Sequence, residues 1–380
     1  LYHLTGVNQE ETVLILMPDA YEERDREILF VKETNELIAI WEGEKLSKEQ
    51  ATAVSGIKRV EWVQTFEGLL HRLVPQVDHI YLATNEHLRA EVIVETRNAR
   101  FIKHCQERYP LHRYERLAPL MHQIRAVKQE EEIRMIQRAC DITEAGFRRV
   151  LGFIKPGVGE WEIEAEYMHE FLRSGSKGFA YTPIIGGGRN ACVLHYITND
   201  QVCQDGDLLL MDVAAEYMGW NADMTRTVPI NGKFTPRQRA VYGAVLRIKR
   251  GANKLLRPGT RPIDYQMAVV EMVEKELVDL KLLDAQEVKK QGPEKLLVKK
   301  YFMHGTSHHL GLDVHDVAPP HELFAEGMVF TIEPGIYIRE EGIGIRLENN
   351  VVIGRDSNID LMAGIPIEAD EIEELMAGKA

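Results

Sequence analysis

Four acidic residues lie inside or beside segments that otherwise have the composition of buried strands. Asp212 follows the apolar run LLLM and Asp223 precedes TRTVPI, while Glu333 follows MVFTI and Glu348 follows GIGIRL. Burying an ionised carboxylate without a partner costs several kcal/mol or more. Four such residues therefore require a counter-charge, and the sequence favours bound metal. A site that holds two metal ions in turn indicates hydrolysis.

An alternative interpretation places these acids on exposed strand faces, where water would solvate them. The runs LLLMDVAA and MVFTIEPG argue against it, because each is apolar on both sides of its acid. Strands that are covered on both faces show this near-continuous apolar pattern. The sequence therefore predicts that the carboxylates are buried.

Each acidic pair also fits a β-hairpin. A turn centred on Tyr217 and Met218 would place Asp212 opposite Asp223, and a turn centred on Glu340 and Glu341 would place Glu333 opposite Glu348. Residues directly opposite each other point to one face, with Cβ atoms roughly 4.5–5.5 Å apart. Two carboxylates at that distance repel each other unless a cation lies between them.

The two hairpins follow similar segments, which predicts an internal duplication with pseudo-two-fold symmetry. KPGVGEWEI and RPGTRPIDY each form a Pro-Gly turn before a helix. A further helix is expected over residues 128–151, from apolar residues at near-helical spacing. Another should begin with Thr235 as its N-cap and Pro236 at its first position.

The length of 380 residues predicts two domains. Residues 1–119 contain the strand-like runs TVLILMP, REILFV and HIYLAT and a helical stretch over residues 86–109, which indicates an α/β domain. Residues 120–380 are expected to form an α+β catalytic domain. The opening LYHLTG has the character of the middle of a domain, so we expect the first domain to be truncated.

Charge and composition exclude some partners. The net charge of −13 argues against binding to nucleic acid or to an anionic membrane, since both reward a basic surface. The basic stretch at residues 289–300 is expected to be a solvated helix face. No apolar run reaches the length of about 18 residues that spans a bilayer. The four cysteines show no CxxC spacing, so we expect free thiols and a cytoplasmic protein.

A histidine cluster, HGTSHHLGLDVHD at residues 304–316, lies between the two acidic hairpins. Gly305, Thr306 and Ser307 are poor helix formers, so a strand or loop that carries one ligand histidine is favoured over a helical HxxxH zinc site. A separate histidine, His195, is expected in a short strand of its own. From the residues alone, it could serve structure or function.

This constellation resembles the pita-bread metallopeptidase family, M24. The resemblance covers residues 120–380 through LHY, MDVAAEYMGWNADMTRT, HGTSHHLGLDVHD, TIEPGIYI and GIRLENN. The first domain and the HGTSH motif most resemble the aminopeptidase P group, whose N-terminal domain is creatinase/prolidase-like. His309 departs from that pattern, where an aromatic residue is common, and one early strand-and-helix unit is missing. The resemblance implies five metal ligands, namely Asp212, Asp223, His308, Glu333 and Glu348.

The resemblance also implies a reaction. Two divalent ions, Mn²⁺ in preference to Zn²⁺ or Co²⁺, would share a hydroxide that attacks the peptide bond before a proline at the second position. Glu333 would shuttle the proton. His195 and His315 would bind substrate or the oxyanion, and His304 would line the proline pocket. Tyr337 and Arg346 are further pocket candidates, although Arg346 could equally pair with a carboxylate.

Two alternatives remain open at this level. A prolidase, which cleaves only Xaa-Pro dipeptides, would have the same ligands and fold. A catalytically dead pita-bread domain would serve only to bind partners, but such proteins generally lose metal ligands, and all five are present. The family often forms homo-oligomers, so a dimer or a larger assembly is expected.

Overall fold

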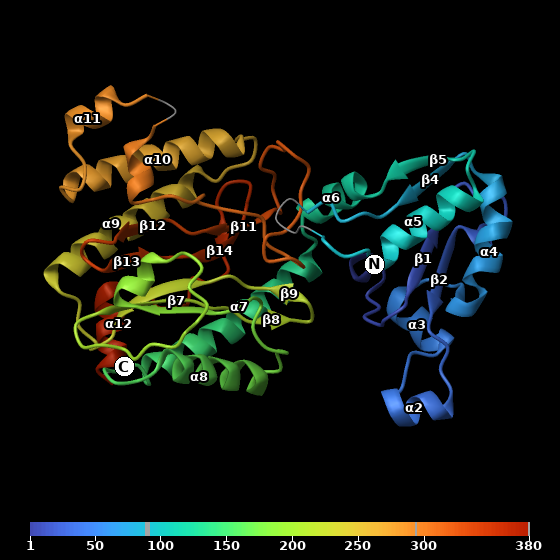
Figure 1. Ribbon diagram of the computed structural model, residues 1–380, viewed down its shortest axis with the longest axis horizontal. Helices are drawn as coiled ribbons and strands as arrows, with labels where there is room; N and C mark the ends of the chain where they lie inside the picture. Colours follow the sequence, from blue (N-terminus) through green and yellow to red (C-terminus); the bar gives the residue numbers. More distant parts are fainter. Residues whose placement is uncertain (88–91, 293–294, 379–380) are drawn as a thin grey trace. The chain divides into compact units, whose positions relative to one another are not determined.

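The computed structural model of the chain describes residues 1–87, 92–292 and 295–378. The chain divides into two compact units, Leu1–Ala118 and Pro119–Ala380 (Figure 1). This division falls one residue before the boundary expected from the sequence.

The first unit is an α/β domain built around β2, which is antiparallel to β1 and parallel to β3. Ile28 and Phe30 of β2 pack into one hydrophobic cluster, and Leu29 and Val31 pack into another. The sheet is therefore covered on both faces, because successive side chains of a strand point to opposite sides. A separate parallel pair is formed by β4 and β5. The elements are β1 (Val13–Leu16), β2 (Glu27–Val31), β3 (Val60–Trp62), β4 (His79–Leu82), β5 (Arg113–Arg116), α1 (Tyr2–Thr5), α2 (Glu36–Glu42), α3 (Lys48–Ser55), α4 (Phe66–Leu73), α5 (Arg97–Arg108), and the 3₁₀ turns η1 (Glu23–Asp25), η2 (Val63–Thr65) and η3 (Val74–Gln76).

Three of the strands in this unit were predicted correctly, but the helix expected over residues 86–109 is shorter. It begins at Arg97, because the side chain of Thr96 caps it by accepting a hydrogen bond from the Ala99 N–H. Residues 92–96 lie outside the helix, and residues 88–91 lie outside the described part of the chain. Strands β3 and β5 were not predicted, since β3 has only three residues and β5 is mostly charged and exposed.

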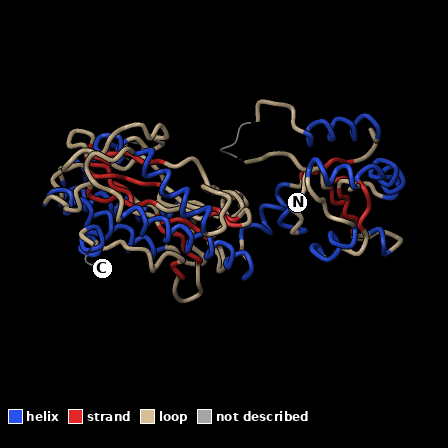
Figure 2. The backbone as a smooth tube through the Cα atoms, turned by 90° about the horizontal axis from the view of Figure 1, so that it is seen from below, coloured by secondary structure: helices blue, strands red, loops and turns tan. Residues whose placement is uncertain are grey.

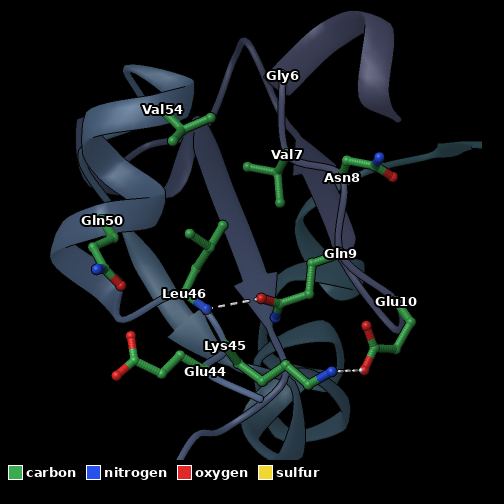
Figure 3. A pocket seen from close by; sticks show the side chains of 10 residues that line it. All are labelled: Gly6, Val7, Asn8, Gln9, Glu10, Glu44, Lys45, Leu46, Gln50 and Val54. Carbon is green, nitrogen blue, oxygen red and sulfur yellow. Dashed lines mark hydrogen bonds and ion pairs between the residues drawn. The ribbon is translucent and has the colours of Figure 1, made fainter. Parts of the chain in front are cut away.

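The first unit also contains a cavity of about 490 Å³ between residues 6–10 and 44–54 (Figure 3). Its lining is tied together by the Lys45–Glu10 ion pair at 2.7 Å. A hydrogen bond of 2.9 Å from the Leu46 N–H to Gln9 Oε1 adds to this. No residue predicted for the active site lies in this cavity.

The second unit has the predicted α+β fold, with helices packed around strands (Figures 1 and 2). The order of its elements repeats in two similar halves. Each half has two consecutive helices followed by a three-stranded antiparallel sheet, ordered β10-β7-β6 in the first half and β11-β14-β15 in the second. Figure 1 shows α7 and α8 on one side of the strands and α9 and α10 on the other. The helices are α6 (Ala118–Ala126), α7 (Glu130–Leu151), α8 (Glu160–Arg173), α9 (Pro236–Leu255), α10 (Pro262–Asp279), α11 (Ala285–Lys290) and α12 (Ala369–Met376), with 3₁₀ turns η4 (Gly188–Cys192) and η5 (Leu297–Lys300). The strands are β6 (Ile184–Gly187), β7 (Leu208–Asp212), β8 (Glu216–Tyr217), β9 (Trp220–Asn221), β10 (Thr225–Pro229), β11 (Val329–Ile332), β12 (Gly335–Ile338), β13 (Ile343–Arg346), β14 (Asn349–Val352) and β15 (Ile359–Asp360).

Helix α9 begins where its predicted cap places it. Thr235 Oγ1 accepts a hydrogen bond from the Gln238 N–H, and Gln238 Oε1 accepts one from the Thr235 N–H, so α9 starts with a capping box. The helix expected over residues 128–151 is α7, which starts two residues later at Glu130 and buries a face containing Ile136 and Phe147. Helices α7 and α9 each pack their buried face into the large hydrophobic core of the second unit.

The first acidic hairpin differs from its prediction by one residue at the turn. Met218 and Gly219, with φ of 50° and 83°, form the turn, so the centre lies one residue later than expected. Positive φ at both central residues is typical of the type I′ turn of two-residue hairpins. Asp212 therefore pairs with Thr225 and not with Asp223. A shift of two positions keeps the same face, so Asp223 remains its diagonal neighbour.

The second acidic hairpin has the predicted register. Gly335 pairs with Arg346, and Ile332 pairs with Asn349. In an antiparallel pair without a bulge, the sum of the two paired residue numbers stays constant, and it is the same for both of these pairs. The hairpin therefore keeps one register, which places Glu333 opposite Glu348. The turn lies between Ile338 and Ile343, which centres it on Glu340 and Glu341 as expected.

The basic segment forms two short elements, not one solvated helix. Helix α11 ends at Lys290 and η5 covers Leu297–Lys300, with exposed side chains at Lys299 and Lys300. Residues 293–294 lie outside the described residues. None of the helices in the described part of the chain combines the length and the apolar character needed to cross a membrane.

Candidate active site

The two halves of the second unit meet along a seam between β10 and the segment that joins β13 to β14. The Glu348 N–H donates to the Thr225 carbonyl at 3.0 Å, and the Thr225 hydroxyl donates to Glu348 Oε2 at 2.7 Å. Two positions further on each side, the Asn350 side chain holds the backbone of Asp223, accepting from its N–H at 3.0 Å and donating to its carbonyl at 2.6 Å. The seam therefore brings an acid from each half into one place.

His308 completes a cluster with these two acids. Donor atoms of Asp223, His308 and Glu348 all lie within 4.8 Å of one another, and they are the group in the described residues that could hold a metal ion. His308 Nε2 lies 3.3 Å from Asp223 Oδ2 and 3.6 Å from Glu333 Oε1. Asp212 joins them through Tyr181, whose hydroxyl oxygen lies 2.5 Å from Asp212 Oδ1 and 2.8 Å from Asp223 Oδ1. The structure thus brings the five predicted ligands together.

None of the four carboxylates is on an exposed strand face. Exposure of the side chain is 14% for Asp212, 7% for Asp223 and 20% for Glu333, while Glu348 is 2% exposed as a residue. The interpretation that water solvates these acids is therefore excluded. Among Asp212, Asp223 and Glu333, the side chain of Glu333 is the most accessible to solvent.

Gathering these acids is electrostatically unfavourable in the absence of a cation. Burial raises the pKa of Glu348 well above its usual range, and the charges of Asp223 and Glu333 raise it further. Burial and neighbouring carboxylates raise the pKa of Glu333 to about 7, although His308 and Arg346 oppose the shift. Burial also raises the pKa of Asp212, against the lowering effect of Arg346. Oxygen-rich donors that repel one another fit hard divalent cations.

Chelating the metals should therefore make the stability of the protein fall as the pH rises from about 5 to about 8. Glu333 has a pKa of about 7 in the folded chain and about 4.3 in an unfolded one. Between these values the folded state binds the extra proton, so stability is lost as the pH rises through the window. Glu333 alone should account for on the order of 3 kcal/mol of the free energy of unfolding. The Tm of EDTA-treated protein, followed across this pH range, reports the loss of stability.

Two controls isolate this effect. Adding divalent metal at pH 8 should restore the stability, because the cation replaces the protons as the partner of the acids. Glu333→Gln should reduce the pH dependence of the chelated protein, since glutamine does not titrate. If the chelated wild type is as stable at pH 8 as at pH 5, the acids are not held in the mutual repulsion described above.

Arg346 forms hydrogen bonds to one predicted ligand, Asp212, and to two residues beside the ligands, Thr225 and Tyr337. Its Nη2 donates to Asp212 Oδ2 at 2.6 Å, its Nε to Thr225 Oγ1 at 2.9 Å and its Nη1 to the Tyr337 hydroxyl at 3.0 Å. Of its two predicted roles, pairing with a carboxylate is the one that the structure contains. Arg346 and Tyr337 are 4% and 1% exposed, so their direct contact with substrate stays a prediction.

His304 lies on the other side of Tyr337 and contacts its hydroxyl. Its Nε2 lies 2.8 Å from the Tyr337 hydroxyl, and its Nδ1 lies 2.7 Å from the Gly305 carbonyl oxygen. The carbonyl can only accept, so Nδ1 carries the proton and Nε2 accepts from Tyr337. Burial and the charge of Arg346 lower the pKa of His304 to about 3, so the ring is neutral at physiological pH.

The histidine segment is a loop, as predicted, and neighbouring rings in it have different surroundings. His309 packs against Phe330 with ring centroids 4.1 Å apart, so it fills the aromatic position in the family pattern as a packing ring. His315 instead lies against His308, with ring centroids 4.2 Å apart and perpendicular planes. Asp316 fixes this part of the loop through Lys128, whose Nζ lies 2.8 Å from Oδ2, and through Arg125.

The prediction of a strand at His195 is wrong. The residue follows η4 in a turn with no strand pairing, and its side chain is exposed. The residues on either side of it, Leu194 and Tyr196, pack against the cluster that contains Tyr337, which places this part of the chain near the site. A strand was predicted because Val193, Leu194 and Tyr196 look strand-like, but the flanking residues Leu194 and Tyr196 pack into a local cluster instead.

Sequence reasoning missed three residues that hold the ligands, namely Tyr181, Thr225 and Asn350. Thr225 and Asn350 each lie two residues from a predicted ligand, in the motifs DMTRT and ENN. Polar residues this close to ligands in apolar segments could have been singled out. Tyr181 is far from all five ligands in the sequence, and nothing in its segment FAYTPII distinguishes it from a core tyrosine.

A duplicated α+β domain that gathers four carboxylates and one imidazole in its interior is the arrangement of a metal-dependent hydrolase. Residues 134–355 match metallopeptidase family M24, and residues 1–81 match the N-terminal domain of aminopeptidase P. The chain belongs to metallopeptidase family M24 and, within it, to the aminopeptidase P group.

Relatives match almost the whole chain. A Xaa-Pro aminopeptidase of Escherichia coli (strain K12) is 35% identical over 391 residues, which cover 99% of this chain and 87% of the relative. The structure of proline aminopeptidase P II from Yersinia pestis is 36% identical, with a TM-score of 0.86 over 99% of this chain and 89% of that one. A zinc-substituted E. coli aminopeptidase P in complex with product is 35% identical, with a TM-score of 0.85 over 100% and 88% of the two chains. The protein is therefore a metallo-aminopeptidase.

Proposed function

We propose that the protein removes the N-terminal residue from peptides that carry proline at the second position. The observation that carries this proposal is the buried cluster of Asp223, His308 and Glu348, with Asp212 and Glu333 beside it, in a chain that matches Xaa-Pro aminopeptidases over nearly its whole length. Proline suits a dedicated site because its ring fixes φ and removes the backbone N–H.

The five residues would hold two divalent ions, with Asp223 and Glu348 shared between them. Bound there, the ions would act as Lewis acids and lower the pKa of water. We propose Mn²⁺, because four carboxylates and one imidazole form a hard, oxygen-rich set, and Zn²⁺ or Co²⁺ as substitutes. Tyr181 would orient Asp212 and Asp223 through the hydrogen bonds of its hydroxyl.

The surrounding residues would handle protons and substrate. Glu333 lies with Oε2 3.8 Å from His304 Nδ1, at the open end of the cluster, and would carry the proton from water to the leaving nitrogen. His195 and His315 would bind substrate or the developing oxyanion. His304, held neutral by burial, would line the proline pocket with Tyr337 behind it.

A comparison of peptide lengths tests this proposal against the prolidase alternative. Purified protein loaded with Mn²⁺ should release the first residue of an Ala-Pro-Ala tripeptide and should leave Ala-Ala-Ala intact. Ala-Pro is the matched dipeptide. Failure on the tripeptide with turnover of the dipeptide would make the protein a prolidase, and failure on both with full metal content would favour a binding module.

We also propose a cytoplasmic location and a homo-oligomeric assembly. All four cysteines are free and buried, which suits a reducing compartment. We propose the oligomer because members of the family often form homo-oligomers. Analytical ultracentrifugation measures the number of subunits directly.

A further inference from the structure

Glu160, the first residue of α8, holds the loop that carries His195. The residue is 1% exposed and accepts three hydrogen bonds. Oε1 accepts from the Gly187 N–H at 2.8 Å, and Oε2 accepts from the Gln201 N–H at 3.0 Å and from the Tyr196 hydroxyl at 2.9 Å. One carboxylate therefore ties the end of β6 to both ends of residues 196–201, the segment that directly follows His195.

Glu164, one helical turn further along α8, holds the same segment at a second point. Its Oε2 accepts from Asn199 Nδ2 at 2.8 Å. Asn199 also accepts from the Ile185 N–H at 2.9 Å and donates to the Pro183 carbonyl at 3.0 Å. Residues four apart share one face of a helix, so the two acids form a rigid support under residues 196–201.

Tyr196 connects this support to the site. Its ring and the side chain of Leu194 pack against the cluster that contains Cys192 and Tyr337, and Tyr337 donates to His304. Its hydroxyl reaches Glu160 and also lies 3.2 Å from Asp200 Oδ1. His195 is thus fixed between two packed neighbours, and only its own side chain is exposed.

We propose that Glu160 and the Tyr196 hydroxyl are positioning residues that hold His195 in place for the reaction. This inference rests on the proposed function, in which His195 contacts substrate or the oxyanion. Glu160 and Tyr196 themselves touch no ligand of the proposed metal centre. They act by limiting the freedom of the His195 loop, and misplacing a substrate-binding group by about 1 Å can cost on the order of 100-fold in rate.

Tyr196→Phe tests the role of the hydroxyl while keeping the ring in its cluster. We expect kcat to fall on the order of tenfold or more, with little change in KM for a group that acts in the transition state. The metal content should not change. Glu166→Gln is the matched control, since Glu166 lies on the same helix and pairs with Arg149 at 2.5 Å, away from the loop.

A double-mutant cycle with His195→Ala separates positioning from general stability. If the hydroxyl acts through His195, Tyr196→Phe should slow the wild type but should not slow His195→Ala further. Independent, multiplicative effects of the two changes would overturn the proposal, as would a normal kcat for Tyr196→Phe.

The imidazole NMR signals of His195 give a readout that does not depend on turnover. They should shift or broaden in Tyr196→Phe and remain as in the wild type in Glu166→Gln. Unchanged signals in Tyr196→Phe would overturn the positioning role even if the wild type cleaves no Xaa-Pro peptide. That lack of cleavage would refute the proposed function alone, so the two failures can be told apart.

Discussion

Asp223→Asn should reduce peptide hydrolysis to background and weaken the binding of divalent metal. Asp223 is central to the cluster, with Oδ2 3.3 Å from His308 Nε2 and Oδ1 2.8 Å from the Tyr181 hydroxyl. An asparagine keeps the volume but removes the negative charge and replaces one acceptor oxygen with a donor. If Asp223 bridges two ions, calorimetric titration with Mn²⁺ should show both sites weakened.

The control for this change is Asp313→Asn, which alters an exposed acid of the histidine loop. It should leave activity and metal binding close to those of the wild type. Retained hydrolysis in Asp223→Asn would refute the bridging assignment. Loss of one ion with the other bound normally would reassign Asp223 as the ligand of a single metal.

The second large effect is expected for His315→Ala, which should keep its metals but turn over more slowly by a factor on the order of 10²–10³. His315 lies against His308 with perpendicular rings, yet it is not in the cluster of mutually close donor atoms. That position suits a group that stabilises charge on the substrate. The measurement is kcat together with metal content, determined on the same preparation.

His169→Ala, at an exposed position of α8, is the control for loss of an imidazole. A near-normal kcat in His315→Ala would remove His315 from the mechanism. A fall in metal content would instead assign it the structural task of supporting His308.

The sequence predicted local features well where one segment determined them. The second hairpin has the predicted register because its turn lies symmetrically between two strongly apolar strands. The first hairpin was misplaced because its turn uses Met218 at positive φ, a conformation that a methionine rarely adopts. An Asn-Gly pair at the turn would have marked the centre. The same-face relation of Asp212 and Asp223 survived the error, since it depends only on the two-residue period of a strand.

Features that depend on contacts distant in sequence could not be predicted. Tyr181 reaches two ligands, and Asn350 clamps the backbone of Asp223, only because the fold brings their segments together. His195 was placed in a strand because its neighbours are apolar, but those neighbours serve the loop cluster. The spacing of apolar residues predicts which side chains are buried. It does not predict which other residues they pack against.

The seam between the halves has a consequence for how the protein comes to fold. Thr225 and Glu348 are 123 residues apart in the chain, and closing so long a loop costs entropy before any contact can offset it. A nascent chain that ends before Glu333 carries three of the five donors and lacks the strand that would complete the seam. Binding a metal ion through all five donors would therefore require the complete domain, and such an ion would link the first half of the domain to the second.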